Sequence, residues 1–387
     1  MIDRRSTISV ATAILFCVFS YAQDNDTALA PPLVIVNPGP EYGGDTRPFQ
    51  GIPGIERAAN GRLWATWYGG GPTEGPENYC MLATSGDDGE TWSDVVLVVD
   101  VPGPVRTFDP CLWHDPDGTL WFFWAQGYTH WDGRAGVWAI TTQNSGDAEP
   151  AWSEPRRICD GIMMNKPTVL STGDWLLPVS IWASQPNVAD PAHAHPIDST
   201  TGSHVYASTD RGETWALRGT SDVPERSCDE HMLVEKKDGT LWKLVRTRYG
   251  VGEAISTDAG ATWDVKGPSA SVPHIPHARF FIRRLNSGKL LLVRHNSPEL
   301  KKRTHLTAYL SEDDGQTWTG GLVLDARDCS YPDGVQAPGG SIYIIYDHER
   351  KGAKQILMAV FTEEDVLAGE PVSDTARMRI VVNQASG

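Results

Sequence analysis

Six short segments of the 387-residue chain contain most of the charged and hydrogen-bonding residues that we consider candidates for catalysis or ligand binding. They read Gln50-Gly51-Ile52-Pro53, Phe108-Asp109-Pro110, Asn165-Lys166-Pro167, Asp229-Glu230-His231, His277-Ala278-Arg279 and Tyr331-Pro332-Asp333. Their cations could bind an anionic group, and their carboxylates and phenol could move a proton. Because buried charges are costly unless they are paired or used, six such segments predict a polar site.

Each of these segments opens a repeated pattern of an apolar strand, a tight turn and a second strand. The instances are 52–67, 110–124, 167–181, 231–245, 280–293 and 332–346. Their starts lie about 50 to 65 residues apart, which suits a four-stranded propeller blade. The sequence therefore predicts an all-β, six-bladed β-propeller of four-stranded antiparallel blades, whose inner strands bring the six segments around one channel. We expect 33–36 or 378–382 to add a closing strand to the last blade.

A second repeat is the octapeptide Ser-x-Asp-x-Gly-x-Thr-Trp. Intact copies begin at Ser85, Ser208, Ser256 and Ser311, and a degenerate copy lies near 144–152. Ser and Asp side chains accept backbone N–H bonds in a tight turn, Gly supplies a positive φ, and Trp packs against the neighbouring unit. We interpret the octapeptide as a structural turn and assign no chemistry to its aspartates.

Composition and the N-terminus restrict the class of protein. The formal net charge of −16 argues against nucleic acid or an anionic membrane as the main partner. Arg4 and Arg5, the apolar stretch 8–20 and a small-residue site ending at Ala22 predict a signal peptide over 1–22, followed by the propeller over 23–387. We therefore expect a secreted or periplasmic protein. The apolar stretch is too short to span a bilayer and no second one follows, so no transmembrane segment is predicted.

The cysteines and histidines give little indication of a metal site. After removal of the signal peptide five cysteines would remain, with no CxxC motif: Cys80, Cys111, Cys159, Cys228 and Cys329. We interpret them as small buried apolar residues, with one disulfide possible. His193 and His195 share a loop but lack an evident third ligand. No metal and no cofactor is expected.

The chain resembles the sialidase (neuraminidase) superfamily of Asp-box, or BNR-repeat, six-bladed propellers. That family pairs a Glu and an Arg about sixteen residues apart on the fourth blade, as Glu230 and Arg246 stand here. An Arg precedes its fifth inner strand, where Arg279 stands, and a Tyr opens the sixth and is followed by an acid, like Tyr331 and Asp347.

This resemblance implies a mechanism. Tyr331 would be the nucleophile, Glu230 would take its proton, and Arg246 and Arg279 would bind a substrate carboxylate. A neutral phenol is not repelled by a sugar that carries a carboxylate on its anomeric carbon. Because the pKa of a phenol lies near 10, it needs an adjacent base.

Two departures from the family pattern bear on the substrate. The family opens its first blade with Phe-Arg-Ile-Pro, whereas this chain has Gly51 in place of that Arg. Lys166 could supply the missing charge. The general acid is usually an Asp on the loop leaving the first blade; our first candidate is Glu77, on the loop 71–78, and the second is Asp109.

The remaining side chains that we expect to contact the sugar are Asn165, Gln50, His231 and Asp333, together with Asp347. The departures leave open sialic acid, a uronic acid or another ulosonic acid as the substrate sugar.

Three functions remain open from the sequence, and all take a glycan or polysaccharide as partner. The first is a secreted sialidase-type exo-glycosidase that hydrolyses a terminal acidic sugar with a Tyr/Glu pair. The second is a polysaccharide lyase acting on a uronic-acid-containing glycan, for which Arg246, Lys166, His231 and Tyr331 would suffice. The third is a non-catalytic carbohydrate-binding propeller.

Overall fold

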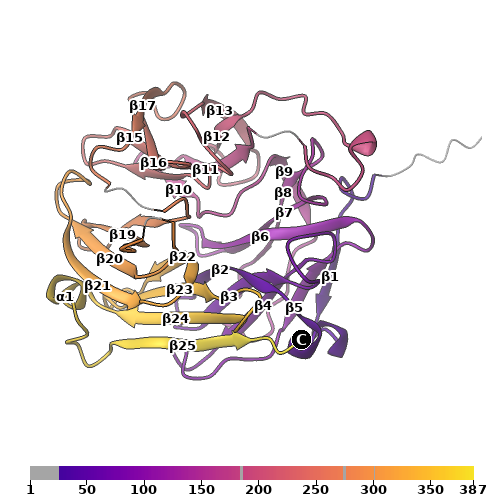
Figure 1. Cartoon of the computed structure of the whole chain (residues 1–387), viewed down its shortest axis with the longest axis horizontal. Coiled ribbons are helices and arrows are strands. Elements are labelled where there is room, and N and C mark those ends of the chain that lie inside the picture. The colour runs from indigo at the N-terminus through magenta and orange to yellow at the C-terminus, as the bar shows by residue number, and fades with distance from the viewer. Residues whose placement is uncertain (1–25, 184–185, 273–275, 300) are drawn as a thin grey trace, which may run out of the picture.

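The chain folds into six antiparallel sheets arranged around a central axis (Figure 1). The computed structural model describes residues 26–183, 186–272, 276–299 and 301–387, so the predicted signal peptide lies outside the described residues. Five sheets have four strands and the first has five. The predicted six-bladed propeller is confirmed. In the described part of the chain, no helix is long and apolar enough to cross a membrane.

Within each of the first three blades the strands follow chain order from the channel outward. Blade 1 comprises β2 (Gln50–Arg57), β3 (Leu63–Gly69), β4 (Tyr79–Ser85) and β5 (Leu97–Asp100), with β1 (Leu33–Val36) at its outer edge. Blade 2 comprises β6 (Val105–His114), β7 (Leu120–Tyr128), β8 (Gly136–Thr142) and β9 (Arg156–Asp160). Blade 3 comprises β10 (Thr168–Val169), β11 (Trp175–Ile181), β12 (Gly202–Ser208) and β13 (Ala216–Ser221).

The last three blades repeat this order. Blade 4 comprises β14 (Met232–Glu235), β15 (Leu241–Thr247), β16 (Gly250–Ser256) and β17 (Asp264–Pro268). Blade 5 comprises β18 (Phe281–Arg284), β19 (Leu290–His295), β20 (Leu306–Ser311) and β21 (Thr319–Asp325). Blade 6 comprises β22 (Cys329–Gln336), β23 (Ile342–His348), β24 (Gln355–Phe361) and β25 (Arg377–Gln384). The described helices are α1 (Glu363–Ala368) and the 3-10 turns Pro40–Tyr42, Gly44–Thr46 and Pro191–His193.

The ring closes without a strand shared between the two ends of the chain. The segment 378–382 lies in β25 and completes blade 6, as predicted, but 33–36 forms β1, which pairs with β5 of blade 1. Side chains and backbone join the two blades instead. Arg47 donates to Asn383 Oδ1 over 2.9 Å, and the backbone N–H of Ser386 donates to the carbonyl of Gly44 over 2.8 Å.

The octapeptides form the predicted turns. In the first copy Ser85 Oγ accepts the backbone N–H of Gly89 at 2.9 Å, and Asp87 Oδ1 accepts that of Thr91 at 3.0 Å. The Thr91 hydroxyl and amide lower the pKa of Asp87 to about 2. The copies follow β4, β12, β16 and β20, at the opposite ends of the blades from the first residue of β2. They are therefore remote from the six polar segments, in agreement with a structural role.

Three inner strands share a bulge near their starts. The register shifts occur in β2, β6 and β22. Each bulge holds a residue that precedes proline and has a positive φ: Ile52 (57°), Asp109 (49°) and Tyr331 (56°). Glu230, just before β14, also has a positive φ of 43°. A positive φ is unfavourable for residues other than glycine, and a following proline restricts the backbone further. The resulting backbone strain marks these positions as candidates for function.

The cysteines in the described part of the chain are all free, and four of the five are buried. This agrees with their interpretation as small apolar residues. Among the described residues, no group of three or more His, Cys, Asp or Glu side chains is placed to hold a metal ion.

Candidate active site

Tyr331, Glu230 and Arg246 form one hydrogen-bonded cluster, although they come from β22, the start of blade 4 and β15. The Tyr331 hydroxyl donates to Glu230 Oε1 over 3.4 Å and lies 3.5 Å from Arg246 Nη1. Arg246 Nη1 also forms an ion pair with Glu230 Oε1. All three residues are less than one-tenth exposed. Glu230 Oε2 has no hydrogen-bond partner among the described residues, so it remains available for a proton.

Two further guanidinium groups face the Tyr331 ring. The Cζ atoms of Arg303 and Arg350 lie 5.7 Å and 5.3 Å from its centroid. Burial raises the pKa of Tyr331 to about 12 with help from Glu230, while Arg246, Arg303 and Arg350 oppose the increase. The phenol is therefore neutral near pH 7 and becomes a nucleophile only with an adjacent base.

Asp109, turned inward by the bulge of β6, is a buried carboxylic acid near this cluster. Burial raises its pKa to about 7; Glu74 and Glu230 add to the increase, and Arg106 and Arg279 oppose it. A carboxyl group with this pKa is largely protonated at slightly acid pH and can donate a proton to a leaving group.

The loop between β3 and β4 presents Glu74, and not Glu77, to the site. Glu77 is exposed, and its side chain lies against Gly71 of its own loop. Glu74 Oε1 accepts a hydrogen bond from Arg350 Nη1 over 2.7 Å. Burial would raise the pKa of Glu74, but nearby cations, Arg350 first among them, lower it overall. The Glu74 carboxylate is therefore ionised and paired, which makes it a poor proton donor.

A cavity of about 790 Å³ opens beside the cluster where blades 5, 6 and 1 meet. Its walls include Phe49 and Glu74 from blade 1, Arg303 from the β19–β20 loop, and Asp347 and Arg350 from blade 6. Burial raises the pKa of Asp347 to about 6, and Arg350 opposes the increase. A cavity of this volume with convergent charged groups is typical of a site for a small polar ligand.

Lys166, Arg279 and Asp333 form a buried ionic network. Lys166 Nζ donates to two backbone carbonyls over 2.6 Å each and lies 2.9 Å from Glu56 Oε1 and 3.2 Å from Asp333 Oδ2. Arg279 donates to Asn165 Oδ1 over 2.8 Å and lies 3.5 Å from Asp333 Oδ1. These two cations thus have internal partners, and their binding of a substrate carboxylate stays a prediction.

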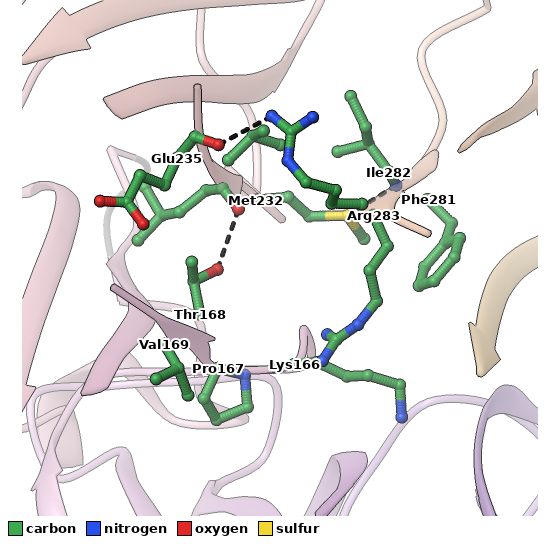
Figure 2. Close-up of a pocket in the computed structure, with 12 residues that line it drawn as sticks. Lys166, Pro167, Thr168, Val169, Met232, Glu235, Phe281, Ile282 and Arg283 are labelled. Carbon is green, nitrogen blue, oxygen red and sulfur yellow. Dashed lines mark hydrogen bonds between the residues drawn. The ribbon is translucent and has the colours of Figure 1, made fainter. Parts of the chain in front are cut away.

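A smaller cavity of about 260 Å³ follows the inner strands of blades 3, 4 and 5. Figure 2 shows Lys166, Thr168, Met232 and Arg283 around it. The hydroxyl of Thr168 donates to a backbone carbonyl of blade 4 over 2.9 Å. This axial cavity shares no lining residue with the cavity beside Tyr331, so the two are separate spaces.

Three other residues that the sequence predicts to contact the sugar form hydrogen bonds within the fold. Gln50 is fully buried and bonds to groups of blades 1 and 6. The His231 ring bonds to a backbone carbonyl of blade 3 over 2.8 Å, and burial lowers its pKa well below the usual value. Asn165 donates to the carbonyls of Glu230 and His231 over 2.8 Å and 3.0 Å. Asn165 therefore holds the strained backbone that presents Glu230.

Sequence reasoning missed Arg303, Arg350 and Glu74 because it considered mainly the starts of the inner strands. Arg350 follows the end of β23, and antiparallel pairing of His348 with Cys329 returns the chain to the face that carries Tyr331. Arg246 corresponds by spacing to Asp347, since each lies sixteen residues after Glu230 or Tyr331. Arg350 lies beyond β23, three residues after Asp347, so a search extended past the second strand would find it. Glu74 lies in the loop 71–78 in which the sequence favoured Glu77, and Arg303 lies in a loop that no strand pattern locates.

Comparison with known proteins gives the family. Residues 61–344, more than half of the chain, match the model of the BNR repeat-like domain. The chain belongs to this family. A search of curated protein sequences gave no match.

The solved structures most similar to this BNR-repeat propeller include sialidases. The Hadza microbial sialidase Hz136 has a TM-score of 0.65 at 19% identity, with 84% of this chain and 68% of that chain covered. The intramolecular trans-sialidase from Ruminococcus gnavus has a TM-score of 0.64 at 12% identity, covering 87% and 98%. A protein of unknown function from Dyadobacter fermentans has a TM-score of 0.60 at 19% identity, covering 84% and 95%. The chain therefore has the sialidase-like propeller fold.

Proposed function

We propose that the protein is an exo-acting glycoside hydrolase of sialidase type, which removes a terminal acidic sugar, a sialic acid or a related sugar, from a glycan. The observation that carries this proposal is the contact of the Tyr331 hydroxyl with Glu230 Oε1 beside several guanidinium groups. The sialidases among the structural neighbours support the same reaction class. We also propose that 1–22 directs the protein out of the cytoplasm.

In the proposed reaction, Glu230 takes the phenolic proton as Tyr331 attacks the anomeric carbon. Asp109 gives its proton to the glycosidic oxygen, so the aglycone leaves as a neutral alcohol. Asp109, now ionised, takes a proton from a water molecule that attacks the same carbon. The Tyr331 oxygen then leaves and recovers its proton from Glu230, which restores the enzyme.

The alternative of a uronate lyase is supported less well. That reaction needs a cation against the sugar carboxylate and a base at the C5 proton. Lys166, one of its candidate cations, is saturated by carboxylates and carbonyls, and His231 bonds to blade 3. These two residues do not join Arg246 and Tyr331 in one cluster.

Product analysis tests the proposed reaction. We expect fluorescent aglycone to be released from a 4-methylumbelliferyl glycoside of a sialic acid or another ulosonic acid. The sugar product, measured by mass spectrometry, should be saturated and one water heavier than the glycosyl residue, whereas an anhydro sugar closed by its own hydroxyl would contradict attack by water. An unsaturated product that absorbs near 230 nm from a uronate polymer, without hydrolysis of any acidic glycoside, would show a lyase instead.

The pKa of Asp109 gives the proposed reaction a pH dependence. Because its folded pKa is raised to about 7, the protonated form that can donate declines as pH rises through that value. We expect kcat/KM to fall about tenfold per pH unit well above pH 7. Asp109→Asn should lose this pH dependence. It should also lose most activity on substrates with poor leaving groups, but only a little of its activity on a substrate with an activated aryl leaving group. If the fall of kcat/KM at high pH persists in Asp109→Asn, another residue causes that fall.

A further inference from the structure

Arg350 occupies the space in which a side chain at position 51 would have to lie. A Cβ atom added to Gly51 would lie 2.4 Å from Cδ and 2.5 Å from Cγ of Arg350. Carbon atoms make favourable contacts near 3.5–4.0 Å, so even alanine at this position would push Arg350 away. Gly51 does not have a positive φ, unlike many glycines of this chain. Neighbouring side chains, Arg350 first and then Asp347, and not the backbone conformation, therefore require glycine here.

The contacts of Arg350 hold its guanidinium group at the junction of the cavity and Tyr331. Nη1 donates to Glu74 Oε1 over 2.7 Å, and Cζ lies 5.3 Å from the Tyr331 ring centroid and 6.0 Å from that of Phe49. The side chain is 26% exposed, and Arg350 lines the cavity. Only one guanidinium N–H is used by Glu74, which leaves donors for a ligand.

We propose that Arg350, reaching from blade 6 across Gly51, is a specificity-determining residue that binds the carboxylate of the substrate sugar together with Arg303. This inference rests on the proposed function. Both guanidinium groups lie within 6 Å of the Tyr331 ring and line the same cavity. Arg246 differs from these two in pairing directly with Glu230 through Nη1. A guanidinium fork binds a carboxylate through paired, charge-assisted hydrogen bonds, which a neutral ester cannot form.

Ligand binding by calorimetry tests this proposal without relying on turnover. The probes are N-acetylneuraminic acid and glucuronic acid, each compared with its own methyl ester. Wild-type protein should prefer at least one acid over its ester. Arg350→Ala should reduce that preference about 10- to 100-fold, since a hydrogen bond to a charged group is lost. Gly51→Ala should also reduce it, because the new methyl group displaces Arg350.

A double-mutant cycle separates this mechanism from a general disturbance. In the Arg350→Ala background, Gly51→Ala should cost much less than in wild type, because the two closest clashing atoms have been removed and, of the three nearest, Asp347 Oδ2 at 2.8 Å stays. Gly339→Ala is the matched control, since a Cβ there meets nothing within 4 Å. It should leave acid binding unchanged.

The outcomes distinguish this inference from the proposed hydrolysis. Additive effects of the two substitutions, an acid preference that survives Arg350→Ala, or no acid preference in wild type would each overturn the role of Arg350. If the predicted cycle is found but no acidic glycoside is cleaved, carboxylate recognition stands and the hydrolase proposal fails. If acidic glycosides are cleaved with an unchanged KM in Arg350→Ala, hydrolysis stands and this inference fails.

Discussion

Tyr331→Phe is expected to lower kcat by about three orders of magnitude or more, since it removes the oxygen that would attack the sugar. The structure gives Tyr331 no substitute: Glu230 is its only carboxylate hydrogen-bond partner among the described residues, and that group is placed to accept the phenolic proton. Initial rates with a 4-methylumbelliferyl sialoside, with KM determined separately, would measure the loss.

The phenylalanine variant should still fold and bind. The ring keeps its place near Arg303 and Arg350, and only two long hydrogen bonds are lost, to Glu230 over 3.4 Å and from Arg246 over 3.5 Å, so we expect a small change in Tm. Tyr346→Phe is the matched control, because Tyr346 lies in the same blade as Tyr331 and its hydroxyl bonds to Asp325 of blade 5 over 3.3 Å. Turnover by Tyr331→Phe comparable to that of this control would eliminate Tyr331 as nucleophile.

Glu230→Gln is expected to lower kcat by about 10²- to 10⁴-fold, the usual contribution of a general base, with a smaller change in KM. The amide keeps the shape of the side chain and can still accept a hydrogen bond from Arg246, but it cannot take a proton from Tyr331. Burial, the largest cause of the raised pKa of that phenol, remains in the variant, so spontaneous ionisation at neutral pH stays negligible. Steady-state kinetics that separate kcat from KM would measure the effect.

Stability must be measured with this variant because Glu230 is also the counter-ion of buried Arg246. Removal of one partner of a buried ion pair can cost about 3–5 kcal/mol. Glu253→Gln, which alters a carboxylate in the same blade that bonds to Trp242, is a suitable control for folding and should retain activity. A loss confined to KM in folded Glu230→Gln would make Glu230 a binding residue, and not a base.

Much of the fold could be predicted because its signals are local and repeated. In each blade an apolar run, a turn and a second run predict the first two strands. In four blades an intact octapeptide marks the end of the third strand. The place of β1 could not be predicted in this way. Its four residues could pair with the edge of the first or of the last blade. Only the pairing of β1 with β5 in the folded chain shows that it joins the first.

The candidate site was predicted only in part. The starts of the inner strands lie on one face of the propeller, but their side chains lie at different depths in it. Glu230 and Tyr331 are presented by positive-φ backbone at the mouth, whereas Lys166 enters a network of carboxylates and carbonyls. The sequence shows both as charged or polar residues next to a strand. The sequence did not indicate Arg350, because its role depends on the absence of a side chain at Gly51. These two residues lie about 300 positions apart.

The cavity lies across the junction at which the first and last blades meet without a common strand. Glu74 and Arg350 form an ion pair across this junction, beside the purely structural bond from Gln50 to the carbonyl of Lys354. A ligand that contacts both blades therefore links the two ends of the chain, and its binding free energy adds to that of ring closure. Opening of the junction between blades 1 and 6 would separate Glu74 from Arg350, so we expect it to disrupt the site as well.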